Sequence, residues 1–284
     1  MIYITGSNGF IGKSLCNLLN KKKLKFKKVK IRKKIKSNII EKLSLKNQNI
    51  LIHLGWGKMD DPWSVYHEKY NYINSVSLFR LAKKLNFNKI IFCGSINEYG
   101  DKVGKIKETT KPGNIETLYA KSKLRLTNFG LRFFRNSNTK FYTVRPSYVY
   151  GPFQRKGTLV DLLIKAWKKK KILKMTKCQG YRDYIFVDDV ANGIIKILLN
   201  NCKKNCDIYN LGSQRCITIK DFILSLSKIL NFDNRYLKFG SVPEKREQKQ
   251  LKSYLVTEKA CKILGWKQQY TLKKGLKKIY LSLK

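Results

Sequence analysis

The stretch Ile2-Tyr3-Ile4-Thr5-Gly6-Ser7-Asn8-Gly9-Phe10-Ile11-Gly12 decides the fold. Its apolar and β-branched start predicts a short buried strand, and the glycines follow where that strand must turn tightly into a helix. Glycine permits positive φ and a close approach of the backbone there. A helix that starts near Phe10 would direct its free amide groups and the positive end of its dipole at a ligand above the loop, which suits a pyrophosphate. The alternative is a glycine-rich turn without a ligand.

Apolar periodicity and chain breakers predict an alternation of strands and helices in the first half of the chain. Strands are expected near 1–5, 26–31, 49–54, 88–94 and 140–145, and helices near 10–20, 63–86 and 116–136. This βα alternation predicts an α/β fold with a Rossmann-type, doubly wound parallel sheet. We therefore expect residues 1–150 to form a dinucleotide-binding domain.

The pattern becomes mixed after Gly151. Helices are expected near 158–170, 189–200, 218–230, 257–264 and 271–282, with a strand near 207–211. We expect residues 151–284 to form mainly a smaller, mixed α/β lobe.

The charge of the chain is unusual, because 61 lysines and arginines stand against 18 acidic residues, a formal net charge of +43. The basic residues are spread over the whole length and do not form one stripe or tail. Such a field steers phosphate-rich ligands and favours nonspecific nucleic-acid binding at low salt. We expect no specific nucleic-acid partner.

No run of about 18 uncharged apolar residues exists, and Met1 leads directly into a strand without a charged leader. We therefore expect a cytoplasmic protein without a membrane anchor. The seven cysteines are scattered without a Cys-x-x-Cys pair, and only His53 and His67 could assist them. This pattern predicts free thiols and no metal site.

Tyr119 and Lys123 are four residues apart in a segment with helical periodicity, so they share one helix face. A nearby ammonium favours the phenolate form of tyrosine, which would allow the pair to pass a proton near neutral pH. A chance match in a lysine-rich helix is the alternative. Ser95 ends a predicted buried strand and would lie over the cofactor crevice of an open α/β sheet.

The glycine loop, Ser95 and the Tyr119–Lys123 pair, in this order, resemble the extended short-chain dehydrogenase/reductase family of nucleotide-sugar epimerases, dehydratases and reductases. Further motifs that carry the resemblance are His53-Leu54-Gly55, Asn71 at the opening of a long helix, 145–152, 182–189 and Leu264-Gly265-Trp266. The resemblance implies that Ser95, Tyr119 and Lys123 are catalytic. It also implies that the C-terminal lobe binds substrate and crosses back to the sheet, and that two chains form a homodimer through a four-helix interface.

The resemblance implies a set of cofactor-binding residues in the glycine loop and at the ends of later strands and helices. They are Gly6, Asn8, Gly9, Phe10, Ile11, Gly12, His53, Leu54, Gly55, Asn71, Tyr119, Lys123 and Pro146. Arg32 and Lys33 follow the second predicted strand, where a carboxylate usually marks NAD and a basic residue accommodates the extra phosphate of NADP. We expect NADP(H), with NAD(H) as the alternative.

Departures from the patterns of the family's subgroups reduce the number of reaction types that the resemblance allows. By the resemblance, the 4,6-dehydratases carry an Asp-Glu pair where this chain has Ile96-Asn97, and the epimerase-reductases use a cysteine and a histidine where it has Asn97 and Phe153. Reduction of a 4-keto sugar, or 4-epimerisation through one, remains. The segments 51–57 and 94–100 look most like reductases that finish dTDP- or CDP-linked 6-deoxyhexoses.

The resemblance also implies how a nucleotide-diphosphate sugar is bound. Ser95 and Tyr119 would hold the keto oxygen, and Lys123 the nicotinamide ribose. The substrate-binding residues would be Ser95, Ile96, Asn97, Tyr148, Arg182 and Arg246. The two arginines match positions that grip the pyrophosphate in relatives. A salt bridge with Asp183 is the alternative for Arg182, and a solvated charged loop is the alternative for Arg246.

Overall fold

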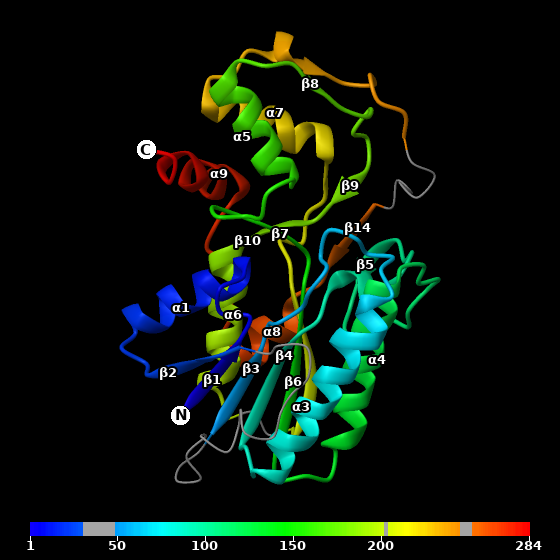
Figure 1. Cartoon of the computed structure of the whole chain (residues 1–284), viewed down its shortest axis with the longest axis vertical. Helices are drawn as coiled ribbons and strands as arrows, with labels where there is room; N and C mark the ends of the chain where they lie inside the picture. Colours follow the sequence, from blue (N-terminus) through cyan, green and yellow to red (C-terminus); the bar gives the residue numbers. More distant parts are fainter. Residues whose placement is uncertain (31–48, 202–203, 245–251) are drawn as a thin grey trace.

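The computed structural model describes residues 1–30, 49–201, 204–244 and 252–284. Its body is a six-stranded parallel sheet, shown in the lower half of Figure 1. The strand order is β11 (Cys206–Leu211), β6 (Lys140–Pro146), β4 (Lys89–Cys93), β3 (Ile50–His53), β1 (Ile2–Thr5) and β2 (Phe26–Val29). The predicted Rossmann-type sheet is therefore confirmed.

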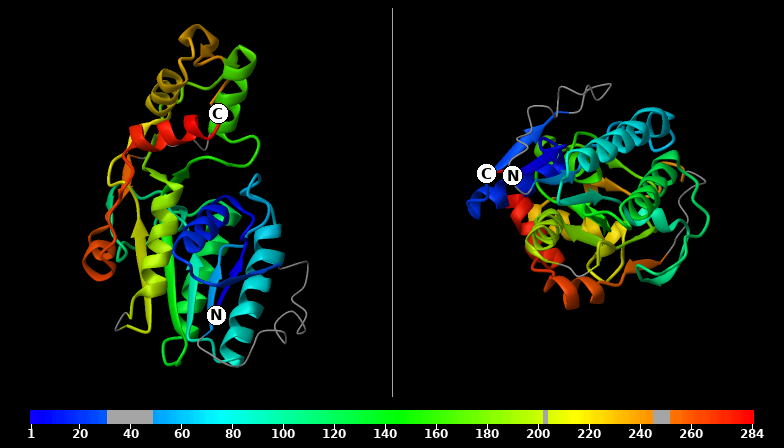
Figure 2. Two further views of the ribbon diagram at one scale, coloured as in Figure 1. Left: turned by 90° about the vertical axis from the view of Figure 1, so that its left-hand side faces the viewer. Right: turned by 90° about the horizontal axis from the view of Figure 1, so that it is seen from below.

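Helices cover both faces of this sheet, because strand residues alternate between two apolar cores. Ile2 and Ile4 of β1 join a core with α1 (Phe10–Lys21), α6 (Val187–Leu199) and α8 (Glu258–Leu264). Tyr3, on the opposite face, joins a core with α3 (Ile73–Lys84) and α4 (Leu118–Phe133). Figure 2 shows the two helix layers on either side of the sheet.

A smaller lobe stands above the carboxyl edge of the sheet (Figure 1). Its helices α5 (Leu159–Lys169), α7 (Ile219–Leu230) and α9 (Leu272–Leu281) share an apolar core that includes Leu163, Phe222 and Leu276. Short strands complete the chain: β5 (Gly104–Ile106) pairs with β14 (Ser253–Leu255), β7 (Tyr148–Tyr150) with β10 (Tyr184–Phe186), β8 (Leu173–Lys174) with β13 (Leu237–Lys238), and β9 (Tyr181–Arg182) with β12 (Ile217–Thr218). Beyond residue 150, α6, β11 and α8 pack with the main sheet.

Two differences from the predicted elements bear on the site. The second strand ends at Val29, before residue 31. The helix expected from residue 63 begins at a π-helical turn, His67–Tyr72, because residues 61–67 close tight turns through the bonds Ser64 N to Asp61 O and His67 N to Ser64 O. Both differences place extra residues beside the cleft described below.

The chain runs from β1 to β2 on one side, then crosses to β3 on the other side of β1. The connection after β1 leads to α1 on one face of the sheet, and the connection after β3 leads to α3 on the other face. Such a switch point forms the ligand crevice of open α/β sheets. The 3-10 turns η2 (Ile96–Tyr99) and η3 (Asn234–Tyr236) follow β4 and α7.

A buried hydrogen-bond chain ties this edge of the sheet to α3. The Gly55 N–H donates to Thr5 Oγ1 (3.1 Å), and that hydroxyl donates to His53 Nδ1 (2.7 Å). Ser75 Oγ donates to the Asn71 carbonyl (2.6 Å), so it accepts from His53 Nε2–H (2.8 Å). These hydrogen bonds thus hold His53 in its neutral form, with the hydrogen on Nε2.

We predict that His53 makes stability fall at acid pH. Burial, assisted by the charge of Lys123, lowers the pKa of His53 from 6.5 to about 3. Below about pH 6.5, His53 is therefore protonated in the unfolded chain and neutral in the folded chain. The free energy of unfolding decreases as pH falls, because the unfolded state binds the extra proton. Between about pH 7 and about pH 5 the wild type should lose about 2 kcal/mol more than His53→Gln, which cannot titrate.

Urea unfolding of both proteins at the two pH values measures this difference. His53→Gln is expected to be less stable at neutral pH, so the test is the change with pH and not the offset. An offset that is the same at both pH values would contradict the prediction.

Candidate active site

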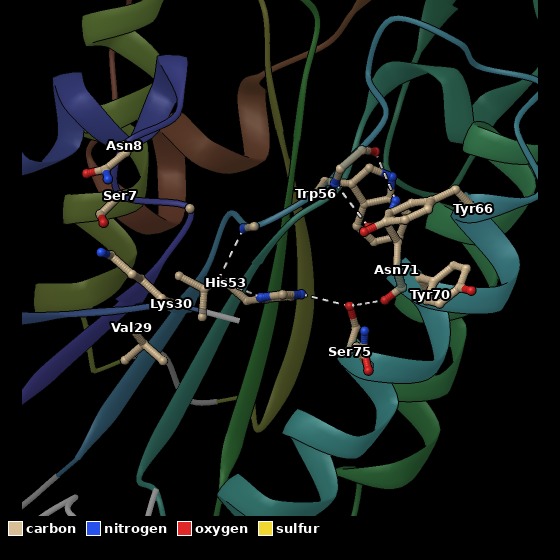
Figure 3. A pocket seen from close by; sticks show the side chains of 15 residues that line it. Ser7, Asn8, Val29, Lys30, His53, Trp56, Tyr66, Tyr70, Asn71 and Ser75 are labelled. Atoms are coloured by element: carbon tan, nitrogen blue, oxygen red, sulfur yellow. Dashed lines mark hydrogen bonds between the residues drawn. The ribbon is translucent and has the colours of Figure 1, made fainter. Parts of the chain in front are cut away.

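A cleft of about 760 Å³ lies at the carboxyl ends of β1, β2 and β3. Figure 3 shows Ser7, Asn8 and Lys30 on one side of it and Tyr66 and Tyr70 on the other. His53, Gly55, Trp56, Gly57, Asn71 and Ser75 line the wall between them. This is the crevice that the strand order predicts.

The glycine loop is built for close backbone contact. Gly6 has φ +67°, and a Cβ atom there would lie 2.6 Å from the Gly55 nitrogen. A Cβ atom on Gly12 would lie 2.1 Å from the Gly6 carbonyl oxygen. Gly9 caps α1 without any side chain, so the amides of the first turn keep their hydrogen-bonding capacity. The loop therefore fits the pyrophosphate of a dinucleotide.

Apart from Tyr119 and Lys123, which are described below, the cofactor residues expected from the sequence divide into three groups. Gly6, Asn8, His53, Gly55 and Asn71 line the cleft. The second group supports it: Gly9 and Gly12 shape the loop, Phe10, Ile11 and Leu54 pack against the cores, and Pro146 is buried at the end of β6. Arg32 and Lys33 lie outside the described residues.

Lys30 is a cleft residue that the sequence did not single out. Because β2 ends at Val29, Lys30 is the first residue after the strand and lines the cleft. The basic run after the second strand was the signal, but the expected strand end was two residues late.

The side chain of Asn71 is occupied by the protein. Its Oδ1 accepts from the Gly57 N–H and its Nδ2 donates to the Gly57 carbonyl, both at 3.0 Å. Asn71 therefore fixes the backbone that follows β3, in addition to lining the cleft.

Ser95, Tyr119 and Lys123 come together beside this cleft. Ser95 caps η2 directly after β4, and Thr117 caps α4 so that Tyr119 enters its first turn. The Ser95 hydroxyl is close enough to the Tyr119 phenol to lower the pKa of that phenol. The Lys123 ammonium is buried, and it donates to the Cys93 carbonyl at 2.6 Å.

The expected acidification of Tyr119 by Lys123 is wrong for this state. Burial raises the pKa of Tyr119, although the Ser95 hydroxyl opposes this effect, and burial lowers the pKa of Lys123 to about 8. Lys123 Nζ lies 5.9 Å from the Tyr119 ring centroid and is directed to Cys93 O instead. At neutral pH the phenol is therefore protonated and suited to donate a proton.

Glu98 supports this group and was missed in the sequence. It is fully buried, and its Oε1 accepts from the Ser95 N–H at 2.8 Å. Its Oε2 accepts from Thr127 Oγ1 of α4 and from Arg145 Nε of β6, both at 2.9 Å. One carboxylate thus joins the three elements around Ser95, Tyr119 and Lys123. A Cβ atom on Gly94 would lie 2.2 Å from Glu98 Oε1, so glycine is required there.

A second cleft, of about 260 Å³, contains the substrate residues expected from the sequence. Ile96, Asn97, Tyr148 and Arg182 line it together. The Arg182 guanidinium lies 4.6 Å from the centre of the Tyr148 ring. Asp183 accepts hydrogen bonds from Ser213 and from the Leu255 N–H. These partners differ from Arg182, for which a salt bridge with Asp183 was the alternative. Arg246 lies outside the described residues.

The described ranges also set limits on other kinds of site. Within them, no group of three His, Cys, Asp or Glu residues is placed to hold a metal ion. No helix in the same ranges is both long enough and apolar enough to cross a membrane.

Comparison with known proteins agrees with this geometry. CDP-abequose synthase of Salmonella typhimurium is 26% identical over 300 residues, covering 98% of this chain and 96% of its own. A putative UDP-glucose 4-epimerase of Methanocaldococcus jannaschii is 24% identical, covering 98% of this chain and 97% of its own.

Solved structures share the fold. UDP-glucose 4-epimerase of Thermotoga maritima, in complex with UDP-glucose, gives a TM-score of 0.85 at 21% identity and covers 99% of both chains. RMD of Pseudomonas aeruginosa, complexed with NADPH, gives 0.82 at 20% identity and covers 98% of this chain and 96% of that chain. The family model for NAD-dependent epimerases and dehydratases matches residues 2–212. The chain therefore belongs to the NAD-dependent epimerase/dehydratase family.

Proposed function

We propose that this protein reduces the 4-keto group of a nucleotide-diphospho-4-keto-6-deoxyhexose, dTDP- or CDP-linked, in deoxysugar and cell-surface polysaccharide biosynthesis. One observation carries the proposal: Ser95, Tyr119 and Lys123 stand between the two clefts. The Trp56 ring, which lines the first cleft, lies over Lys123. Ile96 and Ala120, which follow Ser95 and Tyr119, line the second.

The chain's own residues supply the proton chemistry of such a reduction. The bound nicotinamide would supply the hydride for C4. Ser95 and Tyr119 donate hydrogen bonds to the keto oxygen, where negative charge develops. The Tyr119 phenol then gives its proton to the alkoxide. The Lys123 ammonium, in a site of low polarity, favours the negative charge on both oxygens.

The residues directly after the strand-end serine support reduction over dehydration. Ile96 and Asn97 offer no acid and base after the strand-end serine. Glu98 follows them, but it is buried and both its oxygens accept hydrogen bonds. The positions directly after Ser95 therefore supply no acid–base pair for the loss of water. The similarity to CDP-abequose synthase is compatible with a CDP-linked substrate.

We further propose a homodimer through the helices that carry Asn71 and Tyr119. Val65, Tyr70 and Ile73 are exposed apolar or aromatic side chains at the start of this layer. Sedimentation of the purified protein tests this assembly.

The function is tested by mixing purified protein with dTDP-4-keto-6-deoxyglucose or its CDP counterpart, and with NADPH or NADH. Loss of reduced cofactor that depends on the sugar supports the 4-ketoreductase and identifies its nucleotide. No oxidation of either cofactor, together with NAD already bound to the purified protein, would contradict it. That result would favour the alternative, a nucleotide-sugar 4-epimerase, a class represented among the relatives.

Tyr119→Phe should lower kcat by about 10²- to 10⁴-fold, because it removes the proton donor and keeps the ring. Cofactor affinity should stay within about twofold, since the phenol acts on the substrate oxygen. Steady-state kinetics and a cofactor titration measure both effects. Tyr280→Phe, the same change in α9 of the lobe, is the control and should behave as wild type. A variant that keeps its kcat would exclude Tyr119 as the acid.

Lys30 should help to select NADPH, since its ammonium lines the cleft at the end of β2. Lys30→Ala should weaken NADPH binding about fivefold and leave NADH binding unchanged, because one charge-assisted contact to a phosphate is lost. Fluorescence titration with each cofactor measures this. Lys27→Ala, on the exposed strand β2, is the control. Equal losses for NADPH and NADH would contradict a role in phosphate recognition.

A further inference from the structure

The loop that follows β3 is held against the catalytic pair by a second hydrogen-bond chain. The Trp56 indole N–H donates to His67 Nδ1 at 3.0 Å, and His67 Nε2–H donates to the Asp61 carbonyl at 2.9 Å. His67 is fully buried, and its ring lies parallel to the indole at an interplanar angle of 17°. These bonds fix both the position and the orientation of the Trp56 ring.

The fixed indole contacts both members of the pair. Lys123 Nζ lies 4.0 Å from the Trp56 ring centroid, within the range of a cation–π interaction. The Tyr119 ring meets the indole edge to face, with centroids 6.3 Å apart. The Tyr119 backbone N–H donates to the Pro62 carbonyl of the same loop at 2.9 Å. The loop thus holds α4 where the two side chains leave it.

Lys123 depends on these weak partners because stronger ones are engaged elsewhere. Within the described ranges it forms no ion pair. Its nearest partners are the Cys93 carbonyl, the indole and the Phe92 ring, and the Tyr119 ring lies farther away at 5.9 Å. The titratable groups facing it are the Cys93 thiol, Glu98, His53 and Tyr119. Glu98 is paired with Arg145 and His53 is neutral. A buried ammonium without an anion is costly, so each remaining partner matters.

We propose that Trp56 is a positioning residue whose indole face, locked by His67, holds the charged ammonium of Lys123 beside the cofactor cleft. This inference rests on the proposed function only for the placement of the cofactor, and it applies to any reaction of this site. Tryptophan presents the strongest π face to a cation, and leucine presents none. Loss of the face should lower the pKa of Lys123 by about one unit from its value of about 8.

The test compares Trp56→Phe with Trp56→Leu. Both lose the N–H that binds His67, and only phenylalanine keeps a π face. The affinity for NADPH is measured by nicotinamide fluorescence from about pH 6 to about pH 10. The same measurement is made on Lys123→Met, and a pH transition that is present in wild type and absent from this variant is assigned to Lys123. In wild type the NADPH affinity should decrease as pH rises through this transition, with an apparent pKa of about 8.

Trp56→Leu should move that transition about one unit lower, and Trp56→Phe about half as far. Trp63→Leu, at a tryptophan that is 42% exposed, is the control and should match wild type. If the leucine variant does not fold, His67→Leu, which releases the indole, should move the transition down and His67→Gln, which can accept its N–H, should not.

Equal transitions for the phenylalanine and leucine variants, or transitions like that of wild type, would overturn the inference. The assay contains no sugar, so the proposed sugar reduction can fail while this inference succeeds. The reverse also holds, because sugar-dependent oxidation of NADPH with unchanged transitions would leave the reductase and remove the role of Trp56.

Discussion

The close approach of Gly6 to Gly55 is the constraint on which the rest of the site depends. A single added carbon on Gly6 would meet the Gly55 nitrogen at 2.6 Å, so the loops after β1 and β3 touch through bare backbone. That contact brings the start of α1 to the cleft, and the Thr5 hydroxyl then joins Gly55 to His53. From His53 the connection continues through Ser75 to the helix layer that carries Asn71. The glycine loop, the edge of the sheet and the helix layer are therefore connected by one set of backbone contacts and hydrogen bonds.

The buried polar groups at this edge of the sheet interact with specific protein groups instead of with solvent. Glu98 is stabilised by a guanidinium, a hydroxyl and an amide from three different elements. Lys123 has a carbonyl and aromatic faces instead. Removing one partner of such a group costs more than the bond itself, because the charge left behind stays desolvated. Hydrogen bonds therefore anchor the backbone at Ser95, whereas one carbonyl and two aromatic rings hold the Lys123 ammonium.

Much of the fold could be predicted from the sequence, because apolar periodicity and glycines report local structure directly. The strands of the main sheet lie within two residues of their expected ends, and Ile96, Asn97, Tyr148 and Arg182 do share one cleft. Glu98, Trp56 and His67 were missed for a physical reason. Their roles arise from partners such as Arg145 and Lys123, which lie far away in sequence and meet them only after the sheet has formed.

The return of β11 to the sheet has a consequence for synthesis of the protein. This strand pairs with β6 along its whole length, and α6 and α8 complete the core on the same face. Until residues up to about Trp266 have left the ribosome, the nascent sheet has an open edge at β6 and an uncovered apolar face. The first half of the chain is therefore the part that needs protection during translation, although it carries the glycine loop, Ser95, Tyr119 and Lys123.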